Sequence, residues 1–292
     1  MMAKFSDYLR LIRVKHYIKN FLIFLPLFFS GMYNQLDKLL LCLLGFILFC
    51  FVSSLVYVFN DIADVEKDKL HETKKNRPLA SGVISIRKAY IVTFLLIFII
   101  GICAYGIYIV SGFFGSLLLP LIYVIINILY SKGLKNIALV DVVILVSGFL
   151  IRLFFGGILI GAEVSNYLYL TVMSGAFYMG FGKRRNEFIR SKYNTRSVLK
   201  HYNKDFLDKS MYVCLTLTIV FYSMWTVDPI VTNKICNDYL IWTIPILMIM
   251  LFQYSLSVEN DSDGDPVEVI LQNKPLLCTS LIYILVILFI WL

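Results

Sequence analysis

An asparagine-led acidic motif at the end of an apolar stretch carries the residues with the clearest chemistry. It reads Asn60-Asp61-x-x-Asp64-x-x-x-Asp68. On one continuous α-helix, which turns 100° per residue, the three aspartates fall within an arc of about 60°. Oxygen ligands suit Mg²⁺, whose coordination is commonly completed by waters and substrate phosphates. The motif therefore predicts a Mg²⁺ site with Asp61, Asp64 and Asp68 as ligands, and a solvated acidic helix end neutralised by neighbouring lysines is the alternative.

A basic loop follows this motif and offers partners for phosphate. It reads Lys74-Lys75-Asn76-Arg77-Pro78-Leu-Ala-Ser81-Gly82, and its proline and glycine end any helix. Arg77 is the preferred phosphate contact because a guanidinium can bind phosphate oxygens bidentately. An ordinary basic loop beside a membrane needs no such role, so both interpretations stay open for the loop taken alone.

A second concentration of polar residues lies in and before an apolar segment at 139–161. Lys135 stands in the polar entry to this segment, which then contains Asp141, Gly148 and Arg152. Spacings of 7 and 11 residues place these last three within about 40° of one another on a helix. Such a stripe must face a bundle interior or a wet cavity, and Arg152 is either a substrate contact or the structural partner of a buried carboxylate.

Two further basic motifs complete the candidate residues. Lys183-Arg184-Arg185-Asn186-Glu187 follows another apolar segment, and consecutive cations there are typical of topology or lipid-headgroup contacts. The spacing of four between Lys183 and Glu187 favours a more specific geometry. Near the N-terminus Lys15 and Lys19 are also four apart, which on an α-helix places them on one face.

The elements that position these residues are apolar helices. The chain has 292 residues, of which 59% are hydrophobic and 16% charged, and its mean hydropathy is +0.79, a composition that excludes an ordinary soluble globule. A membrane-spanning helix needs about 20 mostly apolar residues. Nine such segments are expected, at 18–36, 38–60, 89–110, 112–130, 139–161, 166–182, 210–227, 239–257 and 276–292.

The distribution of lysine and arginine predicts the orientation of this helical bundle. Twenty-four of the 27 basic residues lie in 1–20, 61–88, 131–137, 183–209 and 258–275. By the positive-inside rule these segments are cytoplasmic, and so are the N-terminus and the polar face. The net charge of +8 is then explained by topology, and no nucleic-acid partner is expected. The six cysteines form no CxxC or Cys/His cluster, so neither disulfides nor a soft-metal site is expected.

The first acidic motif followed by Arg77-Pro78-Leu-Ala-Ser81-Gly82 resembles the first aspartate-rich motif of the UbiA-type intramembrane prenyltransferase superfamily. The resemblance covers essentially the whole chain and implies one transmembrane domain over residues 1–292. It also implies nine helices and a Mg²⁺-dependent diphosphate site on the cytoplasmic side. Typical members have a second aspartate-rich motif where this chain has Lys183-Arg184-Arg185, and this departure disfavours ordinary aromatic prenylation.

The basic motifs are similar to those of the decaprenyl-phosphate phosphoribosyltransferase branch of that superfamily. The resemblance implies transfer of a 5-phosphoribosyl group from phosphoribosyl pyrophosphate to a polyprenyl phosphate in the plasma membrane. Asp61, Asp64 and Asp68 would bind Mg²⁺ and diphosphate, and Asn60 would orient them. The remaining candidate substrate-binding residues are Lys15, Lys19, Arg77, Lys135, Asp141, Arg152, Lys183, Arg184, Arg185 and Glu187.

Other functions remain possible on the residues alone. The enzymatic alternative is transfer of a polyprenyl group from its diphosphate to an aromatic acceptor such as 4-hydroxybenzoate. Membrane transport is a second alternative, because intramembrane charges such as Arg152 also mark transport pathways. The charges gather at one rim rather than at the midplane, which disfavours transport. A structural scaffold explains the apolar segments but not three carboxylates on one face.

Overall fold

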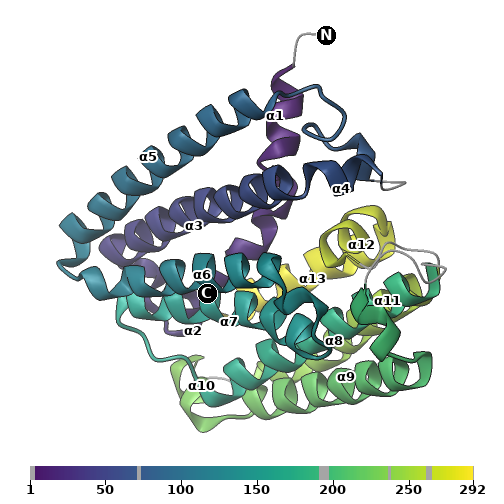
Figure 1. The fold of residues 1–292 in the computed structure, drawn as a ribbon. Coiled ribbons are helices and arrows are strands. Elements are labelled where there is room, and N and C mark those ends of the chain that lie inside the picture. The colour runs from purple at the N-terminus through teal and green to yellow at the C-terminus, as the bar shows by residue number, and fades with distance from the viewer. Residues whose placement is uncertain (1–3, 71–73, 191–196, 236–237, 261–264, 292) are drawn as a thin grey trace. The chain divides into compact units, whose positions relative to one another are not determined.

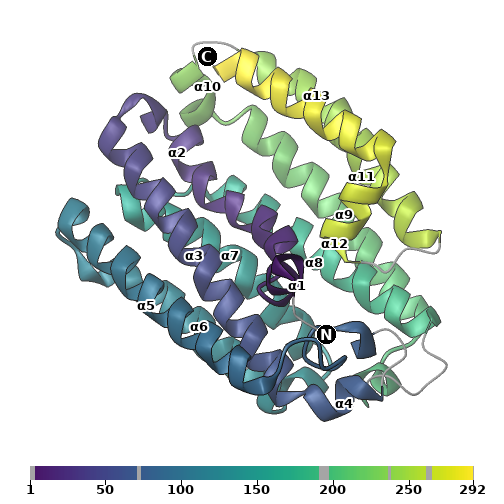
Figure 2. The ribbon, with the colours of Figure 1, turned by 90° about the horizontal axis from the view of Figure 1, so that it is seen from above.

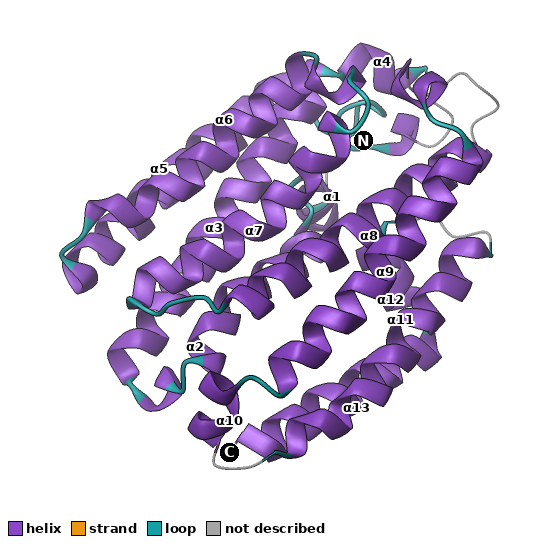
Figure 3. Cartoon of the chain, turned by 90° about the horizontal axis from the view of Figure 1, so that it is seen from below, coloured by secondary structure: helices purple, strands orange, loops and turns teal. Residues whose placement is uncertain are grey.

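The protein is built from helices, as Figure 3 shows. The computed structural model describes residues 4–70, 74–190, 197–235, 238–260 and 265–291, and these contain α-helices and 3₁₀ segments but no strand. The α-helices are α1 Phe5–Leu11, α2 Leu25–Phe29, α3 Leu36–Ala63, α4 Val65–Lys69, α5 Ile86–Ser111, α6 Leu118–Lys132, α7 Val140–Ile160, α8 Asn166–Arg190, α9 Lys204–Thr226, α10 Pro229–Ile235, α11 Ile244–Glu259, α12 Pro266–Gln272 and α13 Lys274–Trp291. The predicted all-α class is confirmed.

Six helices among the described residues are long and apolar enough to cross a membrane. They are Leu36–Ala63, Ile86–Ser111, Phe114–Lys132, Val140–Ile160, Tyr239–Glu259 and Lys274–Trp291. Each overlaps one of the nine segments expected from the sequence. The longest, α3, has 28 residues and therefore extends about 42 Å, more than the roughly 30 Å of a bilayer's hydrocarbon core.

The other three expected spans have a different character. The segment expected at 18–36 is a 3₁₀ helix, Val14–Phe24, followed by the short α2 with Pro26 in its first turn. The segments at 166–182 and 210–227 lie in α8 and α9, which have 25 and 23 residues but are more polar than the six. The count of nine spans and their orientation therefore stay predictions.

The chain divides into two compact units, and the first contains residues Met1–Gly133 and Ile151–Glu163. Within it α5 runs beside α3 (Figures 1 and 2). The start of α5 is capped by Ser85, whose hydroxyl accepts a bond from the Lys88 N–H. Its end is marked by Gly112, whose φ of +65° is a left-handed conformation that glycine adopts at little cost.

Close backbone approach in this unit depends on a glycine of α7. A Cβ added at Gly156 would lie 2.1 Å from the carbonyl oxygen of Ile23, which belongs to the 3₁₀ segment. A backbone atom cannot move aside as a flexible side chain can. Gly156 therefore lets α7 and the N-terminal segment pack together around the buried side chains of Ile23 and Phe155.

Gly156→Ala is expected to destabilise the protein by about 1–3 kcal/mol, because the added methyl group overpacks this contact. The measurement is thermal unfolding of the purified protein in detergent. Gly101→Ala is the matched control, since a Cβ at Gly101 meets nothing within 4 Å. Equal unfolding temperatures for the two variants would contradict the close contact.

The second unit contains residues Leu134–Leu150 and Val164–Leu292. Within it α8 runs beside α9 (Figure 1). A Cβ added at Gly175 of α8 would lie 3.6 Å from the methyl carbon of Thr218 in α9, an ordinary packing distance. A hydroxyl bond supports this packing, since Thr218 of α9 donates to Ser174 of α8 at 3.1 Å. Helix α8 also contacts α11, where the hydroxyls of Tyr178 and Ser255 lie 2.5 Å apart. Helix α7 contributes residues to both units.

Candidate functional site

The first unit holds two aspartates bridged by one arginine. Nη1 of Arg77 donates to Oδ1 of Asp61 at 3.1 Å and to Oδ2 of Asp68 at 2.6 Å. Both aspartates are buried, at 3% and 4% exposure. Folding thus brings together two of the three predicted metal ligands with the predicted phosphate-binding arginine. A guanidinium between two buried carboxylates offsets part of their negative charge, which lowers the cost of burying them.

The expected continuous helix through the acidic motif is wrong in one respect. Helix α3 ends at Ala63, and Asp64 has φ of −99° and ψ of 8° before α4 begins at Val65. The Asp64 side chain is half-buried, and its Oδ1 lies 4.0 Å from Nζ of Lys67.

Two residues that the sequence analysis did not select complete this cluster. Nη2 of Arg13 donates to Oδ1 of Asp61 at 2.7 Å, and its guanidinium lies 4.5 Å over the ring of Tyr57. Arg13 has a positive φ of 54°, an uncommon conformation for a residue other than glycine. Forty-eight residues separate Arg13 from Asp61, so no local spacing could have indicated the pair.

The predicted orienting residue is held from another helix. Oδ1 of Asn60 accepts a bond from the Ser131 hydroxyl at 2.6 Å. Ser131 lies in the last turn of α6, and Asn60 in the last turn of α3. The bond holds the amide of Asn60, the residue that directly precedes Asp61 in the sequence.

The donor set fits Mg²⁺. Among the described residues no three His, Cys, Asp or Glu side chains gather closely enough to hold a metal ion by themselves. Mg²⁺ needs only one or two protein carboxylates, because waters and substrate phosphates complete its octahedral shell. The hydrogen bonds from the two arginines use Oδ1 of Asp61 and Oδ2 of Asp68. All the carboxylate atoms that could bind a metal ion here are hard oxygens, which Mg²⁺ prefers.

The predicted common face of Lys15 and Lys19 is wrong. Both lie in the 3₁₀ segment Val14–Phe24, which has three residues per turn, so a spacing of four places them about 120° apart. Lys15 is exposed and Lys19 is half-buried. The argument from α-helical spacing fails because the segment has a tighter helix.

Arg152 lies buried in the first unit among neutral polar groups and rings. Its Nε donates to Asn20 Oδ1 at 2.7 Å, and its Nη2 donates to Ser53 Oγ at 3.1 Å. The guanidinium also lies 4.7 Å over Phe49 and 4.8 Å over Tyr123. The structure therefore places Arg152 facing the interior of its own unit, as the sequence predicts for an intramembrane charge.

The second unit has its own arginine between two carboxylates. Nε of Arg184 donates to Oδ2 of Asp141 at 2.5 Å, and its Nη1 donates to Oε2 of Glu187 at 2.6 Å. The side chains of Arg184 and Asp141 have 0% exposure. The predicted residues Asp141, Arg184 and Glu187 are thus brought together, with each carboxylate serving as a counter-ion for the same arginine.

Tyr202, which the sequence analysis did not select, supports this ion pair. Its hydroxyl donates to Oδ1 of Asp141 at 2.7 Å and accepts a bond from the N–H of Leu139 at 2.7 Å. Burial raises the pKa of Tyr202 above its usual range, and the hydrogen bond to the Asp141 carboxylate raises it further. The hydroxyl therefore keeps the proton that it donates to Asp141 across neutral pH.

The neighbours of Arg184 in the basic motif have different surroundings. Nζ of Lys183 donates to Oδ2 of Asp265 at 3.2 Å. Nε of Arg185 donates to Asp208, while its Nη1 is buried without a hydrogen-bond partner among the described residues. A buried guanidinium donor without an acceptor is costly. An anionic oxygen from a ligand is the group that would satisfy Nη1.

Lys135 is half-buried in the 3₁₀ turn Leu134–Asn136.

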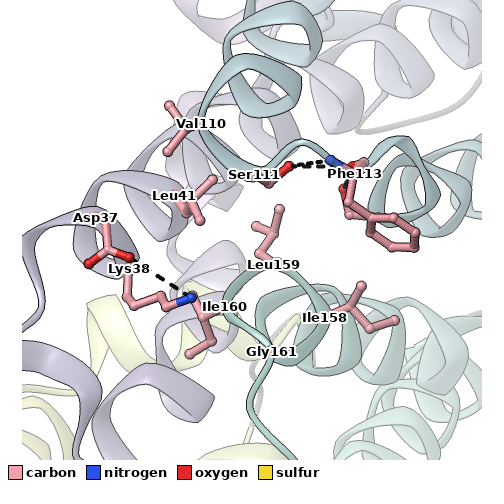
Figure 4. A pocket seen from close by; sticks show the side chains of 11 residues that line it. Asp37, Lys38, Leu41, Val110, Ser111, Phe113, Ile158, Leu159, Ile160 and Gly161 are labelled. Carbon is pink, nitrogen blue, oxygen red and sulfur yellow. Dashed lines mark hydrogen bonds and ion pairs between the residues drawn. The ribbon is translucent and has the colours of Figure 1, made fainter.

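A surface pocket in the first unit lies far from the carboxylate cluster of Asp61 and Asp68. Figure 4 shows Asp37 and Lys38 at its edge, with Ser111 and Gly161 nearby. Asp37 lies near the start of α3 and Asp61 near its end, so about 36 Å of helix separates them. Asp37 and Lys38 pair with each other at 3.9 Å. This pocket does not contain the candidate residues of the carboxylate cluster.

The fold defines an integral membrane protein, because apolar helices of spanning length carry its polar clusters at their ends or buried between them. Residues 22–273 match the UbiA prenyltransferase family, and the chain belongs to this family. It is therefore a membrane transferase. The resemblance found in the acidic motif is confirmed at the level of the family.

Two relatives and one solved structure show what this chain is similar to. The decaprenyl-phosphate phosphoribosyltransferase of Mycolicibacterium smegmatis is 28% identical over 287 residues, which cover 93% of this chain and 88% of the relative. The enzyme of the same name from Corynebacterium glutamicum is also 28% identical, over 94% of this chain and 84% of the relative. A UbiA homolog from Archaeoglobus fulgidus, solved with GPP and Mg²⁺, superposes with a TM-score of 0.68 at 20% identity. It covers 98% of this chain and 99% of its own, a likeness that shows the fold.

Proposed function

We propose that this protein transfers a 5-phosphoribosyl group from phosphoribosyl pyrophosphate to a polyprenyl phosphate of decaprenyl-like length, and releases pyrophosphate. The relatives named decaprenyl-phosphate phosphoribosyltransferase support this reaction, since they match more than nine-tenths of the chain. A reaction between a diphosphate donor and a lipid phosphate needs one carboxylate cluster and several cations, and the chain has both.

The observation that carries the proposal is the environment of Arg185. Its Nη1 is buried and has no acceptor among the described residues, while its Nε is neutralised by Asp208. A phosphate oxygen accepts charge-assisted bonds from arginine. Typical members of the family have a metal-binding second aspartate-rich motif at the position of Lys183, Arg184 and Arg185. Three cations at this position suit direct contact with a substrate phosphate, without a bridging metal ion.

The neighbouring Arg184 is proposed to position this motif rather than to contact substrate. Asp141 and Glu187 hold its guanidinium, which has no exposed surface. Lys15, Lys19, Lys135 and Arg152 remain proposed phosphate-binding residues by their charge and by the resemblance to the branch.

Asp61, Asp64 and Asp68 are proposed to hold Mg²⁺ in the first unit, and Asn60, whose amide oxygen accepts a bond from Ser131, is proposed to orient them. When bound there, the ion would neutralise the charge that develops on the pyrophosphate leaving group. Arg77 offers a planar guanidinium to the oxygens of the same diphosphate.

The proposed reaction needs little help from a general base. A phosphate monoester is largely ionised near neutral pH, because its second pKa is about 6. A phosphate oxygen of the lipid forms a new bond to the anomeric carbon of the ribose, and the bond from that carbon to pyrophosphate breaks. Pyrophosphate leaves with the electron pair of that bond. Positioning and charge stabilisation by the cations are then the main contributions of the protein.

The membrane arrangement is part of the proposal. We infer nine spans in one domain over residues 1–292, with the N-terminus and the candidate residues on the cytoplasmic side of the plasma membrane. The clustering of 24 of the 27 basic residues in five segments supports this orientation.

Purified protein in detergent with Mg²⁺ and phosphoribosyl pyrophosphate plus a polyprenyl phosphate is expected to form the lipid-linked phosphoribose. The comparison reaction contains a polyprenyl diphosphate plus 4-hydroxybenzoate. Products are separated by thin-layer chromatography with a radiolabelled donor in each case. Product from the second reaction alone would replace the proposed function with prenyl transfer to an aromatic acceptor.

A further inference from the structure

We propose that Arg77 competes with the divalent cation for Asp61 and Asp68, so that the cation and the substrate diphosphate bind the first unit as a coupled pair. The inference rests on the metal and diphosphate roles in the proposed function. It adds a dependence between them: neither the cation nor the diphosphate binds tightly without the other.

The competition follows from shared acceptor atoms. One nitrogen, Nη1 of Arg77, lies 3.1 Å from Oδ1 of Asp61 and 2.6 Å from Oδ2 of Asp68. Oδ1 of Asp61 already accepts bonds from both Arg13 and Arg77, and a cation held by these carboxylates brings its positive charge close to the guanidinium of Arg77, which it repels. Arg77 and the cation therefore exclude each other from this pair of oxygens.

The charge balance of the cluster opposes binding of the cation alone. The two aspartates carry two negative charges, and Arg13 and Arg77 carry two positive charges within hydrogen-bond distance of them. A divalent cation added alone gives these four side chains an excess of two positive charges, and counting the half-buried Asp64 as a third ligand still leaves an excess of one. Burying uncompensated charge is strongly unfavourable.

A diphosphate removes both obstacles. Its negative charge restores the balance, and its oxygens accept the N–H groups that Arg77 withdraws from the aspartates. Because coupling between two ligands is reciprocal, the diphosphate must raise cation affinity by the same factor as the cation raises diphosphate affinity. Arg77 is the side chain that carries this coupling, since it can pair with either the aspartates or the diphosphate.

The test measures Mn²⁺ binding without any transfer reaction. Mn²⁺ alone is titrated into purified protein in detergent, and the unbound ion is measured by its electron paramagnetic resonance signal. Arg77→Gln is expected to bind Mn²⁺ about tenfold to hundredfold more tightly than the unchanged protein, the range expected for a charge-assisted contact. It should also bind pyrophosphate more weakly in the presence of Mn²⁺.

Lys75→Gln is the matched control. It removes one positive charge from the same loop at an exposed position, so it is expected to leave Mn²⁺ affinity unchanged. Asp61→Asn added to Arg77→Gln should abolish the gained binding, which locates the ion at the aspartates. If Arg77→Gln does not fold, Arg77→Met also removes the positive charge while keeping a long unbranched side chain, and it should likewise bind Mn²⁺ more tightly than the unchanged protein.

Equal Mn²⁺ affinity in the unchanged protein, Arg77→Gln and Lys75→Gln would overturn the competition, as would gained binding that survives Asp61→Asn. These outcomes are independent of the transfer assay. Phosphoribosyl transfer together with equal affinities would disprove the coupling and leave the proposed function standing. Tighter binding in Arg77→Gln without phosphoribosyl transfer would support the coupling and disprove the proposed donor and acceptor.

Discussion

Asp61→Asn and Asp64→Asn are each expected to lower kcat by at least about a hundredfold. Each change removes one negative charge and one proposed metal ligand, and metal ions stabilise transition-state charge by several kcal/mol. Every 1.36 kcal/mol corresponds to a tenfold change in rate. The measurement is steady-state phosphoribosyl transfer over a Mg²⁺ titration.

The structure assigns different controls to the two aspartates. Asp61 is buried and pairs with Arg13 and Arg77, so its replacement is expected to reduce stability as well, and thermal unfolding must be measured alongside. Asp64 is only half-buried, and Asp64→Asn therefore separates loss of catalysis from loss of fold. Glu66→Gln removes the same charge at an exposed position beside Lys69 and is expected to retain full activity. Near-normal turnover by folded Asp64→Asn would exclude that residue as a metal ligand.

Arg184→Ala is expected mainly to lower the stability of the protein, whereas Arg185→Ala is expected mainly to weaken substrate binding. Removing Arg184 leaves Asp141 as a buried charge without its cation, which costs about 3–5 kcal/mol of stability. Removing Arg185 takes away the proposed phosphate contact, worth about 1.5–3 kcal/mol, and raises KM for one substrate roughly tenfold to hundredfold. The measurements are thermal unfolding in detergent, and kinetics with the donor and the lipid phosphate varied separately.

Two further variants sharpen this comparison. Arg185→Lys keeps the charge but loses the planar fork, and is expected to recover part of the affinity. Lys200→Ala removes a cation at an exposed position of the second unit and is expected to change neither stability nor KM. Unchanged kinetics for Arg185→Ala would return the basic motif to a role in membrane orientation.

The sequence was sufficient for the family and for much of the helical content. Spans of apolar residues and the grouping of basic residues are local or cumulative properties, and they need no knowledge of partners. Six expected spans coincide with apolar helices, and the acidic motif indicated the family that the comparison confirmed. The sequence did not reveal the 3₁₀ geometry of Val14–Phe24 or the break at Asp64, because tertiary context overrides local helical preference.

The amino-acid sequence by itself determined a helical membrane protein with carboxylates and arginines at its polar ends. Only the tertiary structure decided which of these charges pair. Arg13 reaches Asp61 across 48 residues, and Tyr202 reaches Asp141 across 61 residues. The physical reason is that a buried charge takes its partner from whichever element packs against it, and the order of residues along the chain does not contain that information.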